Sequence, residues 1–475
     1  MEHSLLSDPG ETRPVVARWT ITADLVLESA THLGGEVNAS SMMLLRDACQ
    51  GGALLPGTSV AGALRSHLAD VLGGYRVEED PRVAQLLGGS RGDEGGSQSP
   101  LVVFDSLGEL PAKRMIEIRD GVQIEAARGI ADEHKKFDLE VLPAGTRFPL
   151  RFDLVVPAAS EEDKLVSLLV AALSGLSGEI SIGARRSRGL GAARAERWQA
   201  VRYDLSSPDG WMSWILSDAE TPAERGKGLN DVHTACLREL PKLALQALDD
   251  QRRRVVIEVE LASKGPLLVR NAPAEPDAPD AVHLRSGGRS VLPGTSVAGV
   301  LRARAMRIAR IVRSGKEDAE QRVDAIFGPR LDGIPGRNEF RACASRLRIA
   351  ESVVDGSARR RPSRIRIDRF TQGVASGALF EEEVEFGGRV RLRLELRNPQ
   401  DGEVGLLLLV LKDLLSGDLP IGGTSSVGRG VFEGTATLWM EAGIKICVEP
   451  DLSPDPVIDH EIQKLWNAAS IGGIS

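Results

Sequence analysis

The feature that most constrains this chain is a long internal repeat. Eight consecutive residues, Leu55–Gly62, recur without change as Leu292–Gly299, and each copy continues into a helical pattern with the same pair, Leu64-Arg65 and Leu301-Arg302. A period of nearly half of the 475 residues is too long for a solenoid or a propeller blade. The repeat therefore predicts two related domains in tandem.

Two further segments recur in the same order. The glycine-rich segment Ile182–Gly191 matches Ile421–Gly430, and the segment 124–137, which begins with Ile and ends with Phe, matches 367–380. Three matches in one order indicate that a whole domain is duplicated rather than a single turn. We expect equivalent residues of the two copies to occupy equivalent places.

Each copy shows the same succession of patterns. Alternating apolar residues predict strands, and an unbroken apolar run flanked by turn residues predicts a helix. The expected strands are Val15–Glu28, Arg147–Val156, Val255–Leu261 and Arg389–Leu396, and the apolar helices are Leu165–Leu173 and Gly405–Leu415. With the helix after each repeated block and a final strand, the order is strand–helix–strand–strand–helix–strand. This is the ferredoxin-like order of an α+β fold.

The repeat also sets the expected domain boundaries. We expect a first domain over residues 1–200, a helical linker over 201–253, a second domain over 254–442 and a C-terminal tail over 443–475. In the linker, Pro222–Arg238 and Pro241–Asp250 carry helical spacing. Linker and tail have no counterpart in the repeat, so we interpret them as connectors, with subunit contacts as the alternative.

Composition narrows the class of protein. The chain has 67 acidic and 59 basic residues, which excludes a protein that coats nucleic acid by bulk charge but allows a local basic groove. No apolar run is long enough for a transmembrane helix. The four cysteines form no CxxC pair, so neither a zinc site nor a disulfide framework is indicated, and a cytoplasmic location is expected.

The repeated Pro-Gly-Thr-Ser turn precedes a helix in both copies. A helix start offers free backbone N–H groups and a positive dipole end, which suit a phosphodiester. The hydroxyls of Thr58, Ser59, Thr295 and Ser296 would add donors. The alternative is an ordinary capped helix, with these residues as N-caps.

Two further segments concentrate arginine. The loop Gly183–Gly191 holds Arg185, Arg186 and Arg188 among glycines, so that backbone and guanidinium groups can approach phosphates together. Its partner loop keeps the glycines but has Arg429 alone. The stretch 346–369 contains eight arginines, which suggests a basic track on an acidic protein. The alternatives are a flexible turn for the loops and a solvated charge run for the stretch.

These blocks resemble the RAMP superfamily, and specifically the repeated backbone subunits of type III CRISPR effector complexes. The resemblance is carried by His32–Gly35, by the repeated turn and helix, by Asp368–Thr371 with Gly377–Glu383, and by the glycine-rich loops. It covers most of 15–196 and 255–433, and resembles a tandem fusion of two such subunits.

The resemblance implies two RRM-like, ferredoxin-type cores that line up along a CRISPR RNA, next to other subunits of the complex. It further implies a β-hairpin thumb in each domain, expected over Ile118–Phe137 and Arg364–Phe380, which intrudes between guide and target RNA. The residues expected to bind RNA are His32, Thr58, Ser59, Arg65, Arg185, Arg186, Arg188, Thr295, Ser296, Arg302, Arg366, Arg369 and Arg429.

The resemblance also implies a catalytic aspartate in the loop before the repeated turn. Asp280 occupies this place in the second copy, with Asp277 as a rival, and it would hold Mg²⁺ or another divalent cation. The first copy has Ser41 there, so we expect it to bind RNA without cutting it. The second copy departs from the family elsewhere, with Lys264-Gly265 in place of the His-Gly-Gly loop and Val427 in place of an arginine.

Three functions follow as hypotheses. The first is a subunit that binds CRISPR RNA and cleaves complementary target RNA through its second domain. The second is a scaffold for CRISPR RNA without cleavage. The third, a CRISPR RNA processing endonuclease, would need a site centred on histidine.

Overall fold

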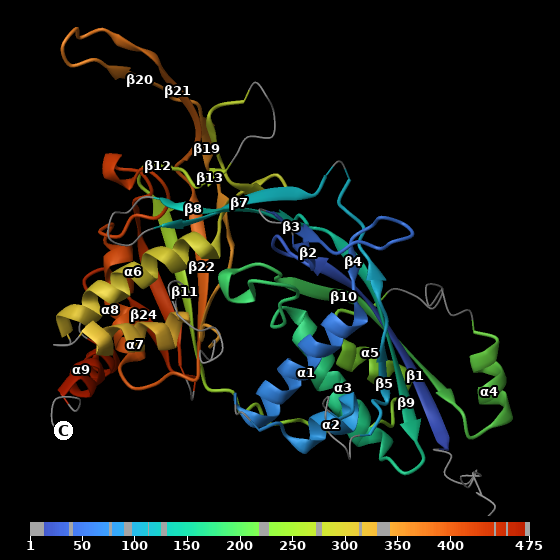
Figure 1. Ribbon diagram of the computed structural model, residues 1–475. Helices are drawn as coiled ribbons and strands as arrows, with labels where there is room; N and C mark the ends of the chain where they lie inside the picture. The colour runs from blue at the N-terminus through green and yellow to red at the C-terminus, as the bar shows by residue number, and fades with distance from the viewer. Residues whose placement is uncertain are drawn as a thin grey trace, which may run out of the picture.

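Two domains of the same fold lie side by side in the computed structural model of the chain (Figure 1). The structure describes residues 14–37, 41–75, 78–89, 97–112, 114–124, 131–217, 228–271, 278–312, 316–329, 343–440, 443–452 and 455–470. Among these residues, no helix is both long enough and apolar enough to cross a membrane.

The first domain is built on a four-stranded antiparallel sheet in the order β10-β1-β9-β5. Its core elements are β1 (Val15–Leu27), α1 (Gly57–Gly73), β5 (Leu101–Val103), β9 (Arg147–Pro157), α3 (Glu162–Ser174) and β10 (Ala193–Asp204). Numbered by their place in the chain, the strands stand in the order four, one, three, two. This arrangement confirms the ferredoxin-like fold.

The second domain repeats this plan. Its core elements are β11 (Arg254–Ser263), α6 (Gly294–Val312), β17 (Leu347–Ile349), β22 (Arg389–Arg397), α8 (Glu403–Leu415) and β23 (Phe432–Trp439). β11 lies between β22 and β23, and β17 pairs with β22, so the strand order is again four, one, three, two. In both domains the alternating side chains of the first strand enter the core, as in β1, where Trp19, Ile21 and Leu25 are fully buried.

Smaller elements complete both domains. In the first these are β2 (Gly34–Val37), β3 (Ser41–Leu44), β4 (Leu54–Leu55), α2 (Pro81–Leu87) and β6 (Ser106–Leu107). In the second they are β12 (Pro266–Leu267), β13 (Arg270–Asn271), β14 (Ala281–His283), β15 (Arg285–Ser286), β16 (Arg289–Leu292), α7 (Lys316–Phe327), β18 (Ser352–Asp355) and β19 (Ala358–Arg360).

Both expected hairpins are present. β7 (Glu117–Ile124) pairs with β8 (Ala131–Val141), and β20 (Ser363–Ile367) pairs with β21 (Val374–Phe386). Phe137 stands opposite Gly121 in the first hairpin, and Phe380 stands opposite Arg364 in the second. This equal register confirms that the two insertions are copies of one element.

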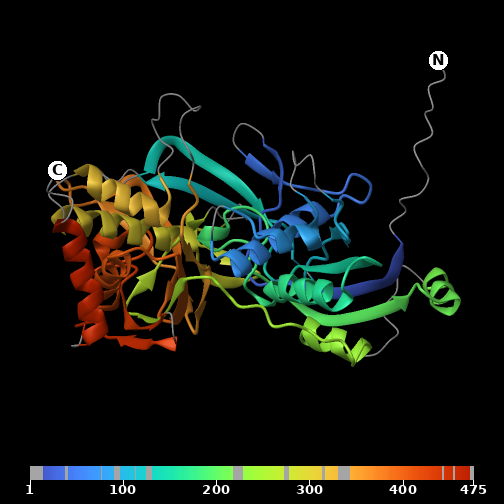
Figure 2. The ribbon, with the colours of Figure 1, turned by 90° about the horizontal axis from the view of Figure 1, so that it is seen from below.

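The two hairpins extend in different directions relative to the two domains. Hairpin β7–β8 reaches across to the second domain in both views, whereas β20–β21 projects away from the rest of the molecule (Figures 1 and 2). The first is anchored by Glu117, whose carboxylate accepts a hydrogen bond from the Gly287 N–H at 2.8 Å. Burial raises the pKa of Glu117.

The linker packs against the first domain. α5 (Val232–Glu239) buries Val232 and Cys236 in that core, whereas α4 (Pro208–Ile215) buries no residue. The expected helix over 241–250 is wrong, because this segment has no regular secondary structure and its Gln246 N–H bonds to the Ser167 hydroxyl at 2.9 Å. A subunit contact stays open for α4, where Trp211 and Ile215 are exposed.

The C-terminal segment belongs to the second domain rather than forming a loose tail. β24 (Lys445–Val448) extends the sheet beside β23, and α9 (Pro456–Ser470) packs on α8. Gly405 of α8 makes this packing close, since a Cβ there would lie 2.3 Å from the Glu461 carbonyl oxygen. Ile458 and Leu465 complete the core.

Candidate functional site

The helices after the repeated turns begin two residues earlier than an N-cap at threonine requires. α1 starts at Gly57 with Pro56 at the N-cap, and α6 starts at Gly294. Thr58 and Ser59 therefore lie exposed in the first turn of α1, and the expectation that threonine or serine caps these helices is wrong. The Asp105 carboxylate accepts a hydrogen bond from the Gly57 N–H at 2.6 Å, so it occupies part of the expected anion site.

The equivalent helix start in the second domain meets the first domain. A Cβ on Gly294 would lie 2.5 Å from the Arg188 carbonyl oxygen, so the glycine-rich loop of the first domain packs directly against the start of α6. Thr295 is exposed in this first turn and Ser296 is half-buried. Thr295 and Ser296 thus place hydroxyl groups at this junction of the two domains.

The arginines of the repeated helices make the same internal contact in both domains. Arg65 pairs with Glu79 through two nitrogens and donates to the Gly88 carbonyl at 3.1 Å, just after α2. Arg302 likewise bonds Asp324 and the Gly328 carbonyl, at the end of α7. These two residues hold the second helix of each domain in place, which explains why the leucine–arginine pair recurs.

The three arginines of the first glycine-rich loop have different environments. Arg188 donates to the Phe327 carbonyl at 2.7 Å across the domain boundary, and the Arg185 guanidinium lies 4.4 Å from the centre of the Phe137 ring. Burial lowers the pKa of both groups. Arg186 is exposed. Arg188 is thus placed in the domain interface, whereas Arg186 faces solvent.

The two glycine-rich loops have equivalent backbones. Gly191 and Gly430 have positive φ angles, and a Cβ on either would lie 1.9 Å from the carbonyl oxygen of the paired isoleucine, Ile182 or Ile421. The residue before this glycine points into the protein in both domains. It is Leu190 in the first domain and Arg429 in the second, and Arg429 is only 1% exposed.

The segments that pack on these loops correspond as well. The His32 carbonyl accepts a hydrogen bond from Ala184 at 3.0 Å, and the Leu268 carbonyl accepts one from Gly423 at 2.7 Å. Leu268, not Lys264 or Gly265, therefore stands in the place of His32. His32 is 5% exposed and its Nδ1 lies 2.8 Å from the Glu140 carbonyl oxygen.

The arginine-rich stretch divides between the domain body and the projecting hairpin. Arg346 is held by Glu403 at the start of α8, with an Nη1–Oε2 distance of 2.9 Å. Arg366 and Arg369 are exposed on the hairpin, where the Arg369 guanidinium lies 4.8 Å from the centre of the Phe370 ring. Phe370 is 81% exposed. The hairpin thus combines free cationic groups with exposed apolar side chains, which include Ile365, Ile367, Val374, Leu379 and Phe380.

Asp280 lies at the base of this hairpin. It is exposed, and one oxygen of its carboxylate accepts a hydrogen bond from the Glu381 N–H at 2.9 Å. The next residue, Ala281, pairs in parallel with Glu382. In the first domain the parallel pairs are Ser41 with Asp138 and Met42 with Leu139. This register gives Asp280 and Ser41 equivalent positions, whereas Asp277 lies outside the described residues.

A divalent cation at Asp280 would depend on ligands from outside the protein. Within the described part of the chain, no three His, Cys, Asp or Glu side chains are grouped to hold a metal. Mg²⁺ is commonly bound by one or two carboxylates together with water and substrate phosphates. The single exposed carboxylate of Asp280 fits that mode and does not fit a closed metal site.

The nearest histidine on the same strand is structural. His283 is buried, and burial lowers its pKa to about 4, so it is neutral near pH 7. Its Nδ1 accepts a hydrogen bond from the Val269 N–H at 3.1 Å, and its Nε2 donates to the Val291 carbonyl at 3.1 Å. Both ring nitrogens are thus occupied by the backbone.

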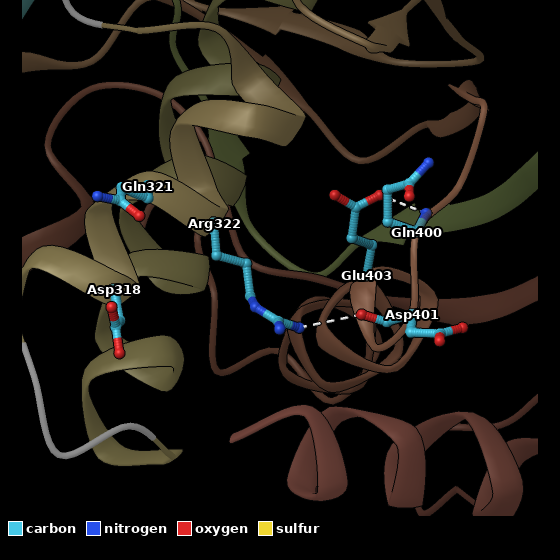
Figure 3. A pocket seen from close by; sticks show the side chains of 6 residues that line it. All are labelled: Asp318, Gln321, Arg322, Gln400, Asp401 and Glu403. Carbon is cyan, nitrogen blue, oxygen red and sulfur yellow. Dashed lines mark hydrogen bonds between the residues drawn. The ribbon is translucent and has the colours of Figure 1, made fainter. Parts of the chain in front are cut away.

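Two hollows on the second domain differ in their relation to this region. One, of about 300 Å³, lies between α7 and the start of α8, where Arg322 donates to the Asp401 carbonyl at 3.2 Å (Figure 3). It contains none of the expected site residues. The other, of about 360 Å³, is lined by Arg285, Arg359 and Glu385 beside the hairpin base.

Sequence reasoning missed three charged residues near Asp280. These are Glu382, Arg270 and Arg364. The Glu382 carboxylate accepts hydrogen bonds from Arg429 Nη2 at 2.7 Å and from Arg270 Nη2 at 3.4 Å, and Arg364 Nε lies 3.7 Å from the same carboxylate. Glu382 lies inside a run of three glutamates. The sequence does not show which of these glutamates become buried, and in the structure Glu382 and Glu383 are buried.

Comparison with known families accounts for both halves of the chain. The model of the RAMP superfamily matches residues 24–194 and 260–433, one match in each domain. No match was found among curated proteins. Membership of this family supports a CRISPR-associated role in RNA binding. With two matches that together span most of its length, the chain belongs to the RAMP superfamily.

Proposed function

We propose that this chain is a backbone subunit of a type III CRISPR ribonucleoprotein, which holds CRISPR RNA along both domains and cleaves complementary target RNA through the second domain. The observation that carries the proposal is the register of β14, which places the exposed Asp280 where the first domain has Ser41. The projecting hairpin beside Asp280 supports it further, because arginines and exposed aromatic rings suit a nucleic-acid backbone and its bases.

The chemistry needs few protein groups, because RNA carries its own nucleophile. The 2′-hydroxyl attacks the adjacent phosphorus, the bond from phosphorus to the 5′-oxygen breaks, and the leaving oxygen takes up a proton. The products are a 2′,3′-cyclic phosphate and a 5′-hydroxyl. Asp280 would orient or deprotonate the 2′-hydroxyl. A Mg²⁺ ion bound there would stabilise the negative charge that develops on the phosphate.

The surroundings of His32 and His283 argue against a processing site centred on either of them. A processing endonuclease would use histidine as its acid or base, yet His283 has both nitrogens bonded to backbone groups and His32 is buried against Glu140. The scaffold without cleavage differs from our proposal only in the role of Asp280.

The test uses the assembled complex with its guide, Mg²⁺ and a labelled complementary RNA. Asp280→Ala should abolish cleavage at the positions served by the second domain while target binding is kept. Ser41→Ala, the matched change in the first domain, should leave every cut in place. If Asp280→Ala cuts like the wild type, the cleavage role is wrong and the scaffold describes the chain. Cleavage of precursor RNA without target or metal would indicate the processing enzyme.

A further inference from the structure

The charged residues around Asp280 are absent from the first domain. Equal strand registers and equal loop contacts define which positions correspond. The second domain has Arg270, Arg364, Glu382 and Arg429 where the first domain has Gly34, Gly121, Leu139 and Leu190. A whole charged cluster therefore accompanies the change from Ser41 to Asp280.

The centre of this cluster is a buried ion pair. Arg429 is 1% exposed and donates from Nη2 to Glu382, which is 6% exposed, at 2.7 Å. The Nε and Nη1 atoms of Arg429 have no hydrogen-bond partner among the described residues. The side chains of Arg270 and Arg364 contact the same carboxylate but remain 59% and 41% exposed. Two of the three arginines thus face outward.

Stability does not explain this pair. In the first domain, Leu139 and Leu190 belong to a small apolar cluster with Ala30 and Val141. Removing two charges from water is costly, and replacing a buried ion pair by apolar residues is often neutral or stabilising. The same backbone therefore accommodates an apolar pair in one half of the molecule and carries an ion pair with unsatisfied nitrogens in the other.

The pair is connected to Asp280 through strand β21. The Asp280 carboxylate accepts a hydrogen bond from the Glu381 N–H at 2.9 Å. The next residues along the two strands, Ala281 and Glu382, are paired through the backbone. Arg429 lies at the other end of the Glu382 side chain. Any shift of this segment of β21 would move the hydrogen bond that orients Asp280.

We infer that Arg429 and Glu382 are a positioning pair for the Asp280 carboxylate, and that Arg270 and Arg364 face an RNA phosphate beside it. This inference rests on the function proposed above. Arg429 acts through Glu382 and β21 and does not itself contact RNA, which corrects the expectation that it belongs to the RNA-binding surface. Its loop glycines fix it in this inward direction.

The experiment gives the second domain the apolar pair of the first. Glu382→Leu combined with Arg429→Leu is introduced into the full chain, assembled with its guide and Mg²⁺. We expect the single-turnover rate of target cleavage to fall by about tenfold or more, because a small displacement of a catalytic group is sufficient for such a loss. Target affinity should stay within about twofold, and the melting temperature should not fall.

Two controls separate the possible results. Arg429→Lys keeps a cation opposite Glu382 and should cut faster than the double variant. Asp280→Ala tests the proposed function alone, so the inference fails by itself if Asp280→Ala stops cleavage and the double variant cuts at the wild-type rate. A loss of rate that only follows a loss of target affinity would also overturn it, since the pair would then serve binding.

Discussion

Arg119 of β7 and Glu351, which lies between β17 and β18, form a buried ion pair across the boundary of the two domains. Arg119 Nη2 donates to Glu351 at 3.0 Å and Nη1 bonds the second carboxylate oxygen. The register of the hairpins gives Pro362 the place of Arg119 in the second hairpin. The first hairpin is thus fixed to the neighbouring domain by a contact that the second hairpin cannot repeat.

Breaking this pair should destabilise the whole chain. Arg119→Met leaves the Glu351 carboxylate buried without its partner, and we expect a loss of about 3–5 kcal/mol in the free energy of unfolding. Adding Glu351→Leu should recover most of the loss, because no unpaired charge then remains. Urea unfolding of the wild type and both variants measures both effects. Equal stability of the single variant and the wild type would contradict a buried pair.

The glycine-rich loop of the second domain permits a matched test of close packing. Gly430→Ala places a Cβ about 1.9 Å from the Ile421 carbonyl oxygen at a φ of 70°, so we expect a loss of more than about 2 kcal/mol. Gly428→Ala also has a positive φ, of 80°, but nothing within 4 Å of the added atom, and should cost about 1 kcal/mol. Thermal unfolding of both variants provides the comparison, and similar losses would contradict the packing argument.

The projecting hairpin should contribute to RNA affinity through its free cationic groups. Changing Arg366 and Arg369 together to alanine should weaken binding of guide and target RNA and lower the slope of log K against log salt by about 1–2. The control changes Arg391 and Arg393 of β22 to alanine, since both are exposed on the sheet and paired with glutamates. Filter binding at several salt concentrations measures both slopes. An equal effect in the control would show that the hairpin is not part of the RNA-binding surface.

The second domain should lose stability as the pH falls below 6.5. Burial lowers the pKa of His283 to about 4, so the unfolded chain takes up a proton at a higher pH than the folded chain does. The resulting loss is about 2 kcal/mol between pH 7 and pH 5 and is complete near pH 4. His283→Gln can keep both backbone hydrogen bonds and should reduce the loss by that amount. His460→Gln on the exposed surface of α9 is the control, and an unchanged pH dependence in His283→Gln would contradict the assignment.

Several expectations failed where distant residues satisfied the backbone. Helix α1 needs no capping hydroxyl from its own turn, because Asp105, far along the chain, accepts the Gly57 N–H. The segment 241–250 has helical spacing but forms no helix, because Gln246 and Leu243 interact with the first domain. Local patterns do not reveal such partners.

The arginines were the least predictable part of the site. The sequence treats Arg65, Arg188, Arg302 and Arg429 like Arg186 and Arg366, as cations near a repeated motif. In the structure the first four bond carboxylates or carbonyl groups of the protein, and the last two are exposed. Whether an arginine side chain points into the protein or toward solvent depends on whether a buried acceptor lies within its reach.

By itself, the sequence determined that two ferredoxin-like domains follow one another, whereas the hairpins and the corresponding places of Asp280 and Ser41 were expected from the resemblance to the RAMP superfamily. Strand and helix periods are local properties of the sequence, and the internal duplication allows one half of the chain to be compared with the other. Only the tertiary structure decided that the first hairpin joins the domains, and that Arg429 and Glu382 form an ion pair where Leu190 and Leu139 meet in the first domain. Those contacts join residues far apart in the chain, and their charges matter only once burial removes them from water.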